Sequence, residues 1–267
     1  FLKNYKPQEG FLGFNLNFHS LNFNNSQVLF ETNQSQNSPT YNINFENELI
    51  TIGNGISAQF GALFLLKNIR LGVTYDSPQW IELTDETKQS ISAFHYEEGL
   101  IVKEEISPSV TNQYDIYQIK IPSKTTLSFA YVFGPKGLFS IDYSNQNFAN
   151  TSLNNDFGSN YLTDVTQRIA SRFEGVNTLR VGGEYRIKDI SFRAGFLNQN
   201  TVHSNTIKNN KALTFGIGLD FGASSLGISL VNYEQNKEFE LFSEGLTDPY
   251  FLRQKITQLT ISYNFKL

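Results

Sequence analysis

The sequence lacks cysteine and methionine, has a single tryptophan and is poor in charge. Only 17% of its 267 residues are charged, against roughly 25% in an ordinary soluble domain. Without cysteine the chain forms neither disulfides nor cysteine-ligated zinc sites. Its three histidines, His19, His95 and His203, fall on different segments and show no metal-ligand spacing. We therefore expect no metal ion and no other cofactor.

Further absences narrow the class of protein. The formal net charge is −4, and the sequence shows no basic patch of the kind that neutralises nucleic-acid phosphates. The longest apolar run, Phe60 to Leu66, is far shorter than the about 20 residues that a membrane-spanning helix needs. Neither a serine–histidine–acid set nor a glycine-rich phosphate loop is present. We expect no nucleic-acid partner and no catalytic residues, so the protein is predicted not to be an enzyme.

The sequence does contain many aromatic residues, and in many short segments apolar and polar residues alternate strictly. Phe and Tyr number 24 and 13. Successive side chains of a strand point to opposite faces, so a segment in which every second residue is apolar has one apolar and one polar face. The clearest apolar series are Leu259, Ile261, Tyr263, Phe265 and Leu267, and Leu213, Phe215, Ile217, Leu219 and Phe221.

The alternation predicts about ten strands, joined by connections that are in turn short and long. The strands are expected near residues 10–23, 50–66, 69–78, 117–133, 138–148, 176–187, 190–199, 211–221, 226–235 and 255–267. Long polar loops are expected near 24–49, 79–116, 149–175, 200–210 and 236–254. Transmembrane barrels show this asymmetry, with short turns on the periplasmic side and long loops outside.

The apolar faces of these strands carry no charge, whereas the opposite faces hold residues such as Arg70, Asp142 and Arg186. A charge that faced lipid at the membrane midplane would cost about 2–4 kcal/mol, which explains the sorting. A soluble β-sandwich would show the same alternation. It would, however, place Lys and Glu on its polar face, where this sequence uses Gly, Ser, Thr and Asn. The sequence therefore predicts an all-β fold, a transmembrane antiparallel up-and-down β-barrel over residues 1–267.

One segment departs from the strand pattern. Between Tyr161 and Glu174 apolar residues recur at helical spacing. Asn160 is expected to cap the helix and Gly175 to end it. The helix, within residues 160–175, would lie in an extracellular loop, where it either packs on the barrel rim or forms a lid over a ligand entrance.

The inward face offers the candidate binding residues. Glu184 and Arg193 should lie opposite one another across a two-residue turn, and Arg180 shares their face. These charges either form a polar ladder that stiffens the wall, since charges in the lumen need partners, or leave Arg180 or Arg193 to receive a ligand carboxylate. Leu63 and Leu65 also point inward. They indicate either a path for apolar cargo or contact with an inserted N-terminal segment.

Several stretches resemble a known family in the same order along the chain. They are Asn68 to Gln79 (NIRLGVTYDSPQ), Ile121 to Tyr143 (IPSKTTLSFAYVFGPKGLFSIDY), and Leu179 to Arg186 (LRVGGEYR) followed by FRAGF at 192–196. This ordered set resembles the FadL/TodX-like outer-membrane transporters of long-chain fatty acids and other hydrophobic compounds. The resemblance implies a fourteen-stranded barrel plugged by an N-terminal hatch. With about ten strands present, we expect this sequence to be the C-terminal portion of a longer chain, without the hatch and the first strands.

The resemblance implies passive uptake of hydrophobic compounds through the outer membrane of a Gram-negative cell. A ligand such as a fatty acid would be caught at the extracellular loops, pass the plugged barrel and leave through a gap in the wall. Arg180 and Arg193 are the candidates for its carboxylate, Trp80 and Phe173 for the rim, and Leu63 and Leu65 for the apolar path. The expected partners are this small molecule and outer-membrane lipid.

Another class of function stays open. The barrel could instead be a scaffold or cargo adaptor of a secretion machinery, with the loops at 79–116 and 236–254 docking a protein partner. An open diffusion porin fits less well, because a water-filled channel has little use for apolar inward residues.

Overall fold

The computed structural model describes residues 9–33, 40–106, 111–155, 158–203, 209–239 and 250–265. Within them, fifteen strands form one antiparallel sheet. The strands are β1 (Glu9–Thr32), β2 (Thr40–Leu66), β3 (Ile69–Asp76), β4 (Gln79–Glu97), β5 (Leu100–Ile106), β6 (Asn112–Gln113), β7 (Tyr117–Ile121), β8 (Lys124–Val132), β9 (Gly137–Asn147), β10 (Ser152–Asn154), β11 (Gly175–Ile187), β12 (Ile190–Gln199), β13 (Asn210–Asp220), β14 (Ser224–Phe239) and β15 (Tyr250–Phe265). The described helices are α1 (Asn160–Arg172) and the short 3-10 helices η1 (Gly134–Lys136) and η2 (Phe148–Asn150). The chain is an all-β protein, as predicted.

Some of these strands are pieces of one longer strand. β3 and β4 both pair with β2 and are separated at Ser77 and Pro78, because proline has no N–H to donate to the ladder. Ser77 spans the gap: its N–H donates to the carbonyl of Ala58 at 2.8 Å, and its hydroxyl accepts the N–H of Ala58 at 2.9 Å. In the same way β5, β6, β7 and β8 together form the next wall strand, which pairs with β4 and β3. β9 and β10 form the one after it, which pairs with β8 and β7. The fifteen strands therefore make the ten wall strands that the alternation predicts.

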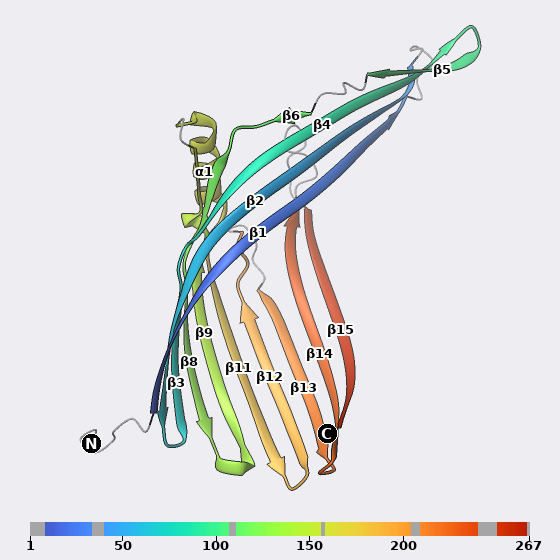
Figure 1. The fold of residues 1–267 in the computed structure, drawn as a ribbon. Coiled ribbons are helices and arrows are strands. Elements are labelled where there is room, and N and C mark those ends of the chain that lie inside the picture. The colour runs from blue at the N-terminus through green and yellow to red at the C-terminus, as the bar shows by residue number, and fades with distance from the viewer. Residues whose placement is uncertain are drawn as a thin grey trace.

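The wall strands follow one another up and down, each beside its neighbour in sequence. Figure 1 shows the sheet bent around a hollow, with β1 and β15 at its two edges. In the described part of the chain β1 pairs with β2 alone and β15 with β14 alone. The ten strands thus form the curved wall of an up-and-down barrel. The turns at 67–68, 133–136, 188–189 and 221–223 lie at one end of it, here called the turn end, whereas the turn between β4 and β5 at 98–99 lies toward the other end.

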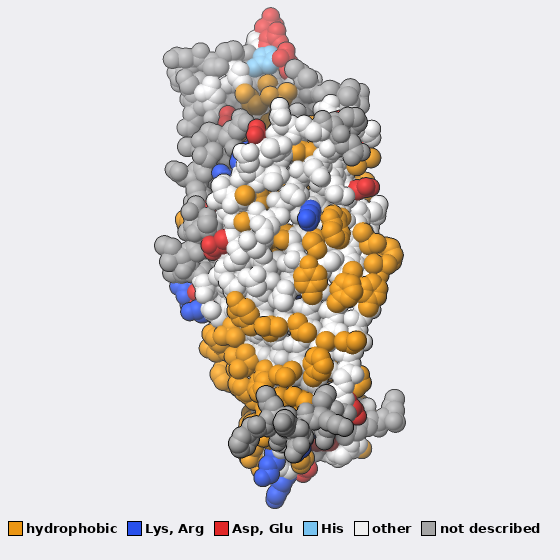
Figure 2. Space-filling model, turned by 90° about the vertical axis from the view of Figure 1, so that its left-hand side faces the viewer, with side chains coloured by type: hydrophobic (Ala, Val, Ile, Leu, Met, Phe, Trp, Pro, Cys, Tyr) orange, Lys and Arg blue, Asp and Glu red, His pale blue; other side chains and the backbone are white. Residues whose placement is uncertain are grey.

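The sheet sorts its side chains as the alternation predicts. Ile187 pairs with Ile190 across a two-residue turn, and Leu66 pairs with Ile69 across another. Apolar side chains cover the convex face, where Phe215 and Ile261 are 56% and 65% exposed. Figure 2 shows hydrophobic side chains gathered over the part of one face nearest the turn end. An apolar surface of this extent, facing away from the protein, indicates an apolar environment.

The end of the sheet opposite the turn end, here called the far end, holds the small apolar core of the described residues. Ile81, Leu83 and Leu162 are its buried hydrophobic side chains. β2 approaches Ile81 and Leu83 closely because it has glycine opposite them. A Cβ on Gly53 would lie 2.3 Å from the Leu83 side chain, and one on Gly55 would lie 2.5 Å from the carbonyl of Trp80. Only glycine fits this close approach.

Two of the predicted polar loops are wrong, because the wall strands continue through them. β1 and β2 stay paired from Glu9 and Leu65 to Thr32 and Asn42, and β4 pairs with β5 up to Glu97 and Leu100. These segments are predicted as loops because their apolar residues do not form one continuous face. Backbone hydrogen bonds can pair two strands without a continuous apolar face where both faces of the sheet contact water. Figure 1 shows the extended β1, β2 and β4 sweeping beyond the rest of the wall. Much of the predicted loop at 236–254, namely residues 240–249, lies outside the described residues.

The helix is present, with different ends from those predicted. Ser159 and not Asn160 is its N-cap, and the last helical residue is Arg172. The side chain of Asn155 accepts the N–H of Ser159 at 3.0 Å. Among the described residues, no helix is both long and apolar enough to cross a membrane.

Candidate functional site

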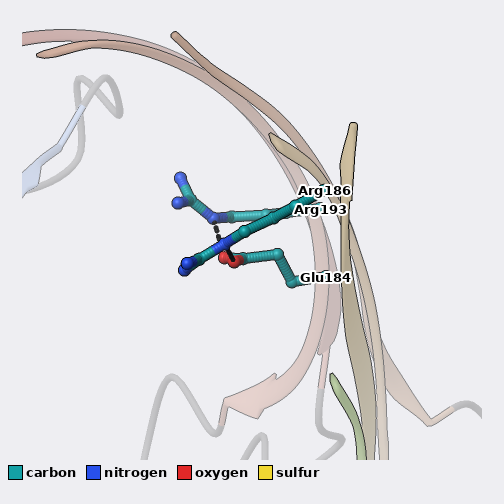
Figure 3. A network of polar contacts seen from close by, with 3 residues as sticks. All are labelled: Glu184, Arg186 and Arg193. Atoms are coloured by element: carbon teal, nitrogen blue, oxygen red, sulfur yellow. Dashed lines mark hydrogen bonds and ion pairs between the residues drawn. The ribbon is translucent and has the colours of Figure 1, made fainter. Parts of the chain in front are cut away.

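The inward face of β11 and β12 carries a cluster of one acid and two arginines. Glu184 pairs with Arg193 in the register of these strands, as predicted. Arg193 Nε donates to one carboxylate oxygen of Glu184 at 2.6 Å, and Arg186 donates to the other. Figure 3 shows all three side chains pointing into the hollow of the curved sheet. The Glu184 side chain is only 15% exposed, against 51% for Arg193, so the arginines cover the acid and leave a net positive charge toward the lumen.

Arg180 lies on the same face of β11, four residues before Glu184. Its neighbours across the sheet are Asp142 on β9 and Leu197 on β12. In the described part of the chain Arg180 makes no hydrogen bond or ion pair, and it is exposed. Of the two predicted carboxylate ligands, Arg193 is therefore engaged by Glu184, and Arg180 is available.

The other predicted site residues are spread over the molecule. Leu63 and Leu65 point inward near the turn end, beside Phe11 and Glu9 of β1. Trp80 lies on the opposite face of the sheet, paired with Ile56, and is 37% exposed.

Phe173 follows α1 and forms an isolated bridge with His203, their rings meeting edge to face at 5.1 Å. The structure thus places Arg180 and Arg193 on the inward face of neighbouring strands, four register positions apart, and Leu63 and Leu65 on the inward face of β2, but does not gather the six predicted residues into one site. Their roles stay predictions.

A cavity of about 590 Å³ lies at the far end, between the inward face of the sheet and α1. Its apolar wall is formed by one residue of β2, one of β10 and two of α1: Leu49, Leu153, Leu162 and Val165. Three tyrosines line it as well: Tyr114, Tyr117 and Tyr161. A concave space with aliphatic and aromatic walls and a few polar groups is the usual form of a small-molecule site.

The local sequence explains why α1 stays over this cavity. Leu162, Val165 and Ile169 recur at helical spacing and give α1 one apolar side. Thr166, on the next turn, satisfies the free edge of β10. Its hydroxyl accepts the N–H of Leu153 at 2.9 Å and donates to the carbonyl of the same residue at 3.2 Å. Thr166 therefore takes the place of a neighbouring strand, and ties the helix to the sheet.

The base of the cavity is polar and negatively charged. Asp85 accepts a hydrogen bond from the Thr51 hydroxyl at 2.6 Å and one from the Tyr117 hydroxyl at 3.1 Å. Burial and the neighbouring Asp85 carboxylate raise the pKa of Tyr117 well above its ordinary value, with a smaller contribution from Tyr161. Tyr117 pairs with Leu83, beyond Trp80 on β4, and the outward face of β4 continues there with Glu82 and Thr84. Tyr117 consequently holds its proton firmly and stays a hydrogen-bond donor to Asp85 at neutral pH.

Sequence reasoning predicted the helix over this cavity and weighed a lid over a ligand entrance. It missed the rest of the cavity, because most of the other lining residues come from segments predicted as loops. One signal was available. The Pro78 and Pro122 breaks lie on neighbouring strands, and apolar alternation resumes beyond the first of them at Ile81 and Leu83. That pattern indicates a second, separately packed part of the sheet.

Other candidate sites are weaker. A second cavity of about 670 Å³ lies on the other side of the same segment, and it shares Tyr114, Asp115, Tyr117 and Asn155 with the first. Its remaining lining is mostly polar, with Glu82 and Thr84 from the outward face of β4. Among the described residues no group of three or more His, Cys, Asp or Glu side chains is placed to hold a metal ion.

Comparison with known proteins adds a likeness of fold. No protein-family model and no curated protein matches the chain. The chain is similar to two crystal structures of TodX, the toluene transporter of Pseudomonas putida. One aligns with a TM-score of 0.44 and 11% identity, the other with a TM-score of 0.35 and 10% identity, and each alignment covers 95% of this chain and 87% of the other. The resemblance predicted from the sequence is thus met again among solved structures, at the level of the fold and no further.

Proposed function

We propose that the chain forms the wall of an outer-membrane barrel through which hydrophobic compounds are taken up passively. The convex apolar face would meet lipid, and the turn end would face the periplasm, as in other transmembrane barrels. The far end, with α1, would then be extracellular, and the inward face would line the route. The observation that carries the proposal is the aliphatic and aromatic cavity under α1, placed where a compound arriving from outside would first meet the inward face.

Burial of apolar surface supplies the driving force for capture, roughly 25 cal/mol per Å² removed from water. No cofactor and no covalent step enters this function. A carboxylate-bearing compound such as a fatty acid would need a cation farther along the inward face, and Arg180 is the side chain available for it. Arg193 would have to exchange Glu184 for the ligand.

Uptake measured in cells tests the proposal. The chain, within the full-length protein, is produced in the outer membrane of a Gram-negative host, and uptake of labelled toluene and labelled oleate is followed at low concentration. Val165→Trp places an indole ring in the cavity, whereas Gln167→Trp places the same ring on the exposed side of α1. We expect Val165→Trp to lower uptake toward that of cells without the protein, and Gln167→Trp to leave it unchanged. Equal uptake with and without the protein, for both compounds, would refute the proposal.

The role of the arginines is measured in the same assay. Replacement of both Arg180 and Arg193 by alanine is expected to lower oleate uptake and to spare toluene uptake. If oleate uptake is unaffected, the carboxylate assignment is wrong and passage of uncharged compounds remains.

A further inference from the structure

The cavity under α1 has an unusual balance of charge for a site proposed to receive a fatty acid. Two carboxylates line it, those of Asp85 and Asp115. Among the described residues that line it, none is Lys, Arg or His. Arg180 and the Glu184 cluster lie on β11 and β12, which contribute no lining residue to this cavity.

Asp85 is held in place and has spare capacity to bind. The hydroxyls of Thr51 and Tyr117 each donate to a different oxygen of its carboxylate. An ionised carboxylate accepts about four hydrogen bonds, so each oxygen can take another donor. Neutral hydroxyl donors leave the negative charge of Asp85 in place, and the side chain is only partly exposed to water that would screen it.

The tyrosines add a second attraction of the same sign. The face of an aromatic ring carries partial negative charge and attracts ammonium groups, most strongly where water is excluded. Tyr114, Tyr117 and Tyr161 surround the same space as Asp85. A carboxylate ligand would meet two like charges there and lose water without gaining a donor cation, and that cost is large in a partly desolvated site.

We infer that the cavity under α1 binds apolar molecules that carry a positive charge, such as organic ammonium ions, in preference to neutral analogues and against carboxylates. The ammonium group would lie between Asp85 and the tyrosine rings, and the apolar body would lie along Leu49, Leu153 and the underside of α1. This inference deepens the proposed function and rests on it for the onward path of the ligand. Binding at the cavity itself can be measured without transport.

Three probes with the same alkyl chain separate the possibilities. Octyltrimethylammonium, octanol and octanoate are titrated by calorimetry into the purified full-length protein in a neutral detergent. We expect affinity to fall in that order, with the ammonium bound about tenfold more tightly than the alcohol. The inference is overturned if octanoate binds as tightly as the ammonium, or if the alcohol and the ammonium bind equally.

Variants place the effect in the cavity. Asp85→Asn keeps the shape of the side chain and an oxygen for Thr51, and it should remove most of the tenfold preference without changing octanol affinity. Glu82→Gln makes the same change of charge on the opposite face of β4 and serves as the matched control. If Asp85→Asn fails to fold, Tyr161→Leu, on the exposed start of α1, should lower ammonium affinity alone.

The outcome separates the inference from the proposed function. If toluene uptake is intact and no preference for the ammonium is found, the inference fails and the function stands. If the ammonium binds with the stated preference but no compound is taken up, the cavity is a binding site and the transport proposal fails.

Discussion

The wall near the turn end and the region at the far end are stabilised in opposite ways. In the wall, apolar side chains such as Ile217 and Ile261 point away from the protein and are exposed, at 48% and 65%. At the far end, Ile81 and Leu83 point inward and are buried, at 6% and 7%. The wall depends on its hydrogen-bonded ladder and on what surrounds it, whereas the far end packs a small core of its own beneath α1. The same alternation of residues therefore has opposite meanings in the two regions.

The largest expected effect comes from the core of the far end. Leu83→Ala removes a buried side chain that packs against Gly53 and should destabilise the pairing of β2 with β4 by about 2–5 kcal/mol. Hydrogen exchange of the β4 amides measures this opening free energy. Ile52→Ala, on the neighbouring residue of β2 and facing the other way, should change it by less than about 0.5 kcal/mol. Equal effects of the two variants would show that the far end has no core of its own.

The wall is tested by a charge on its convex face. Ile217→Arg on β13 should destabilise the protein in lipid vesicles by about 2–4 kcal/mol, because the guanidinium would face hydrocarbon. Ser229→Arg, across the ladder from Gly216, points inward and should cost much less. Denaturant unfolding in vesicles gives both values. Comparable losses for the two variants would contradict the assignment of the convex face to lipid.

The smallest effect is a loss of stability at high pH that belongs to the far end alone. Tyr117 has a pKa raised by burial and by Asp85, so the folded state keeps the tyrosine proton where the unfolded state, with a pKa of about 10, has lost it. By linkage the free energy of unfolding is unaffected below pH 10 and falls as the pH rises above it, toward the folded pKa. Hydrogen exchange at the far end, recorded on both sides of pH 10, measures the loss. Tyr117→Phe should remove this part of the pH dependence, and a steeper dependence in that variant would contradict the assignment.

The sequence predicts the wall better than the far end, for a physical reason. Ten wall strands, the pairing of Ile187 with Ile190 and the position of Arg193 opposite Glu184 follow from a period of two and from turn length. That signal exists only where one face of the strand meets an apolar environment. In the continuation of β1 beyond Phe23 both faces are largely polar, so the sequence pattern does not predict its pairing with β2. The cavity under α1 is formed where β2, β4, β7, β10 and α1 come together, and the local sequence pattern of a single element does not predict that arrangement.

The ends of the helix illustrate the limit for a short-range signal. Apolar spacing gives the existence of α1 and its apolar side. The choice of Ser159 over Asn160 as N-cap depends on Asn155, which holds the Ser159 N–H from outside the helix. The candidate binding residues show the same limit over longer distances. Turn length places Arg193 opposite Glu184, but only the side-chain contacts in the structure show that Glu184 engages Arg193 and leaves Arg180 available.

The breaks in the wall strands lie side by side. Pro78 interrupts one strand, Pro122 interrupts the next at the same level, and η2 interrupts the third. Three adjacent strands therefore lack backbone hydrogen bonds along one line across the sheet. A sheet bends most easily where such hydrogen bonds are missing. If β4, β7, β10 and α1 tilt relative to the strands at the turn end, the line of breaks is the axis of that movement. The far end can then bend while the strands at the turn end keep their register.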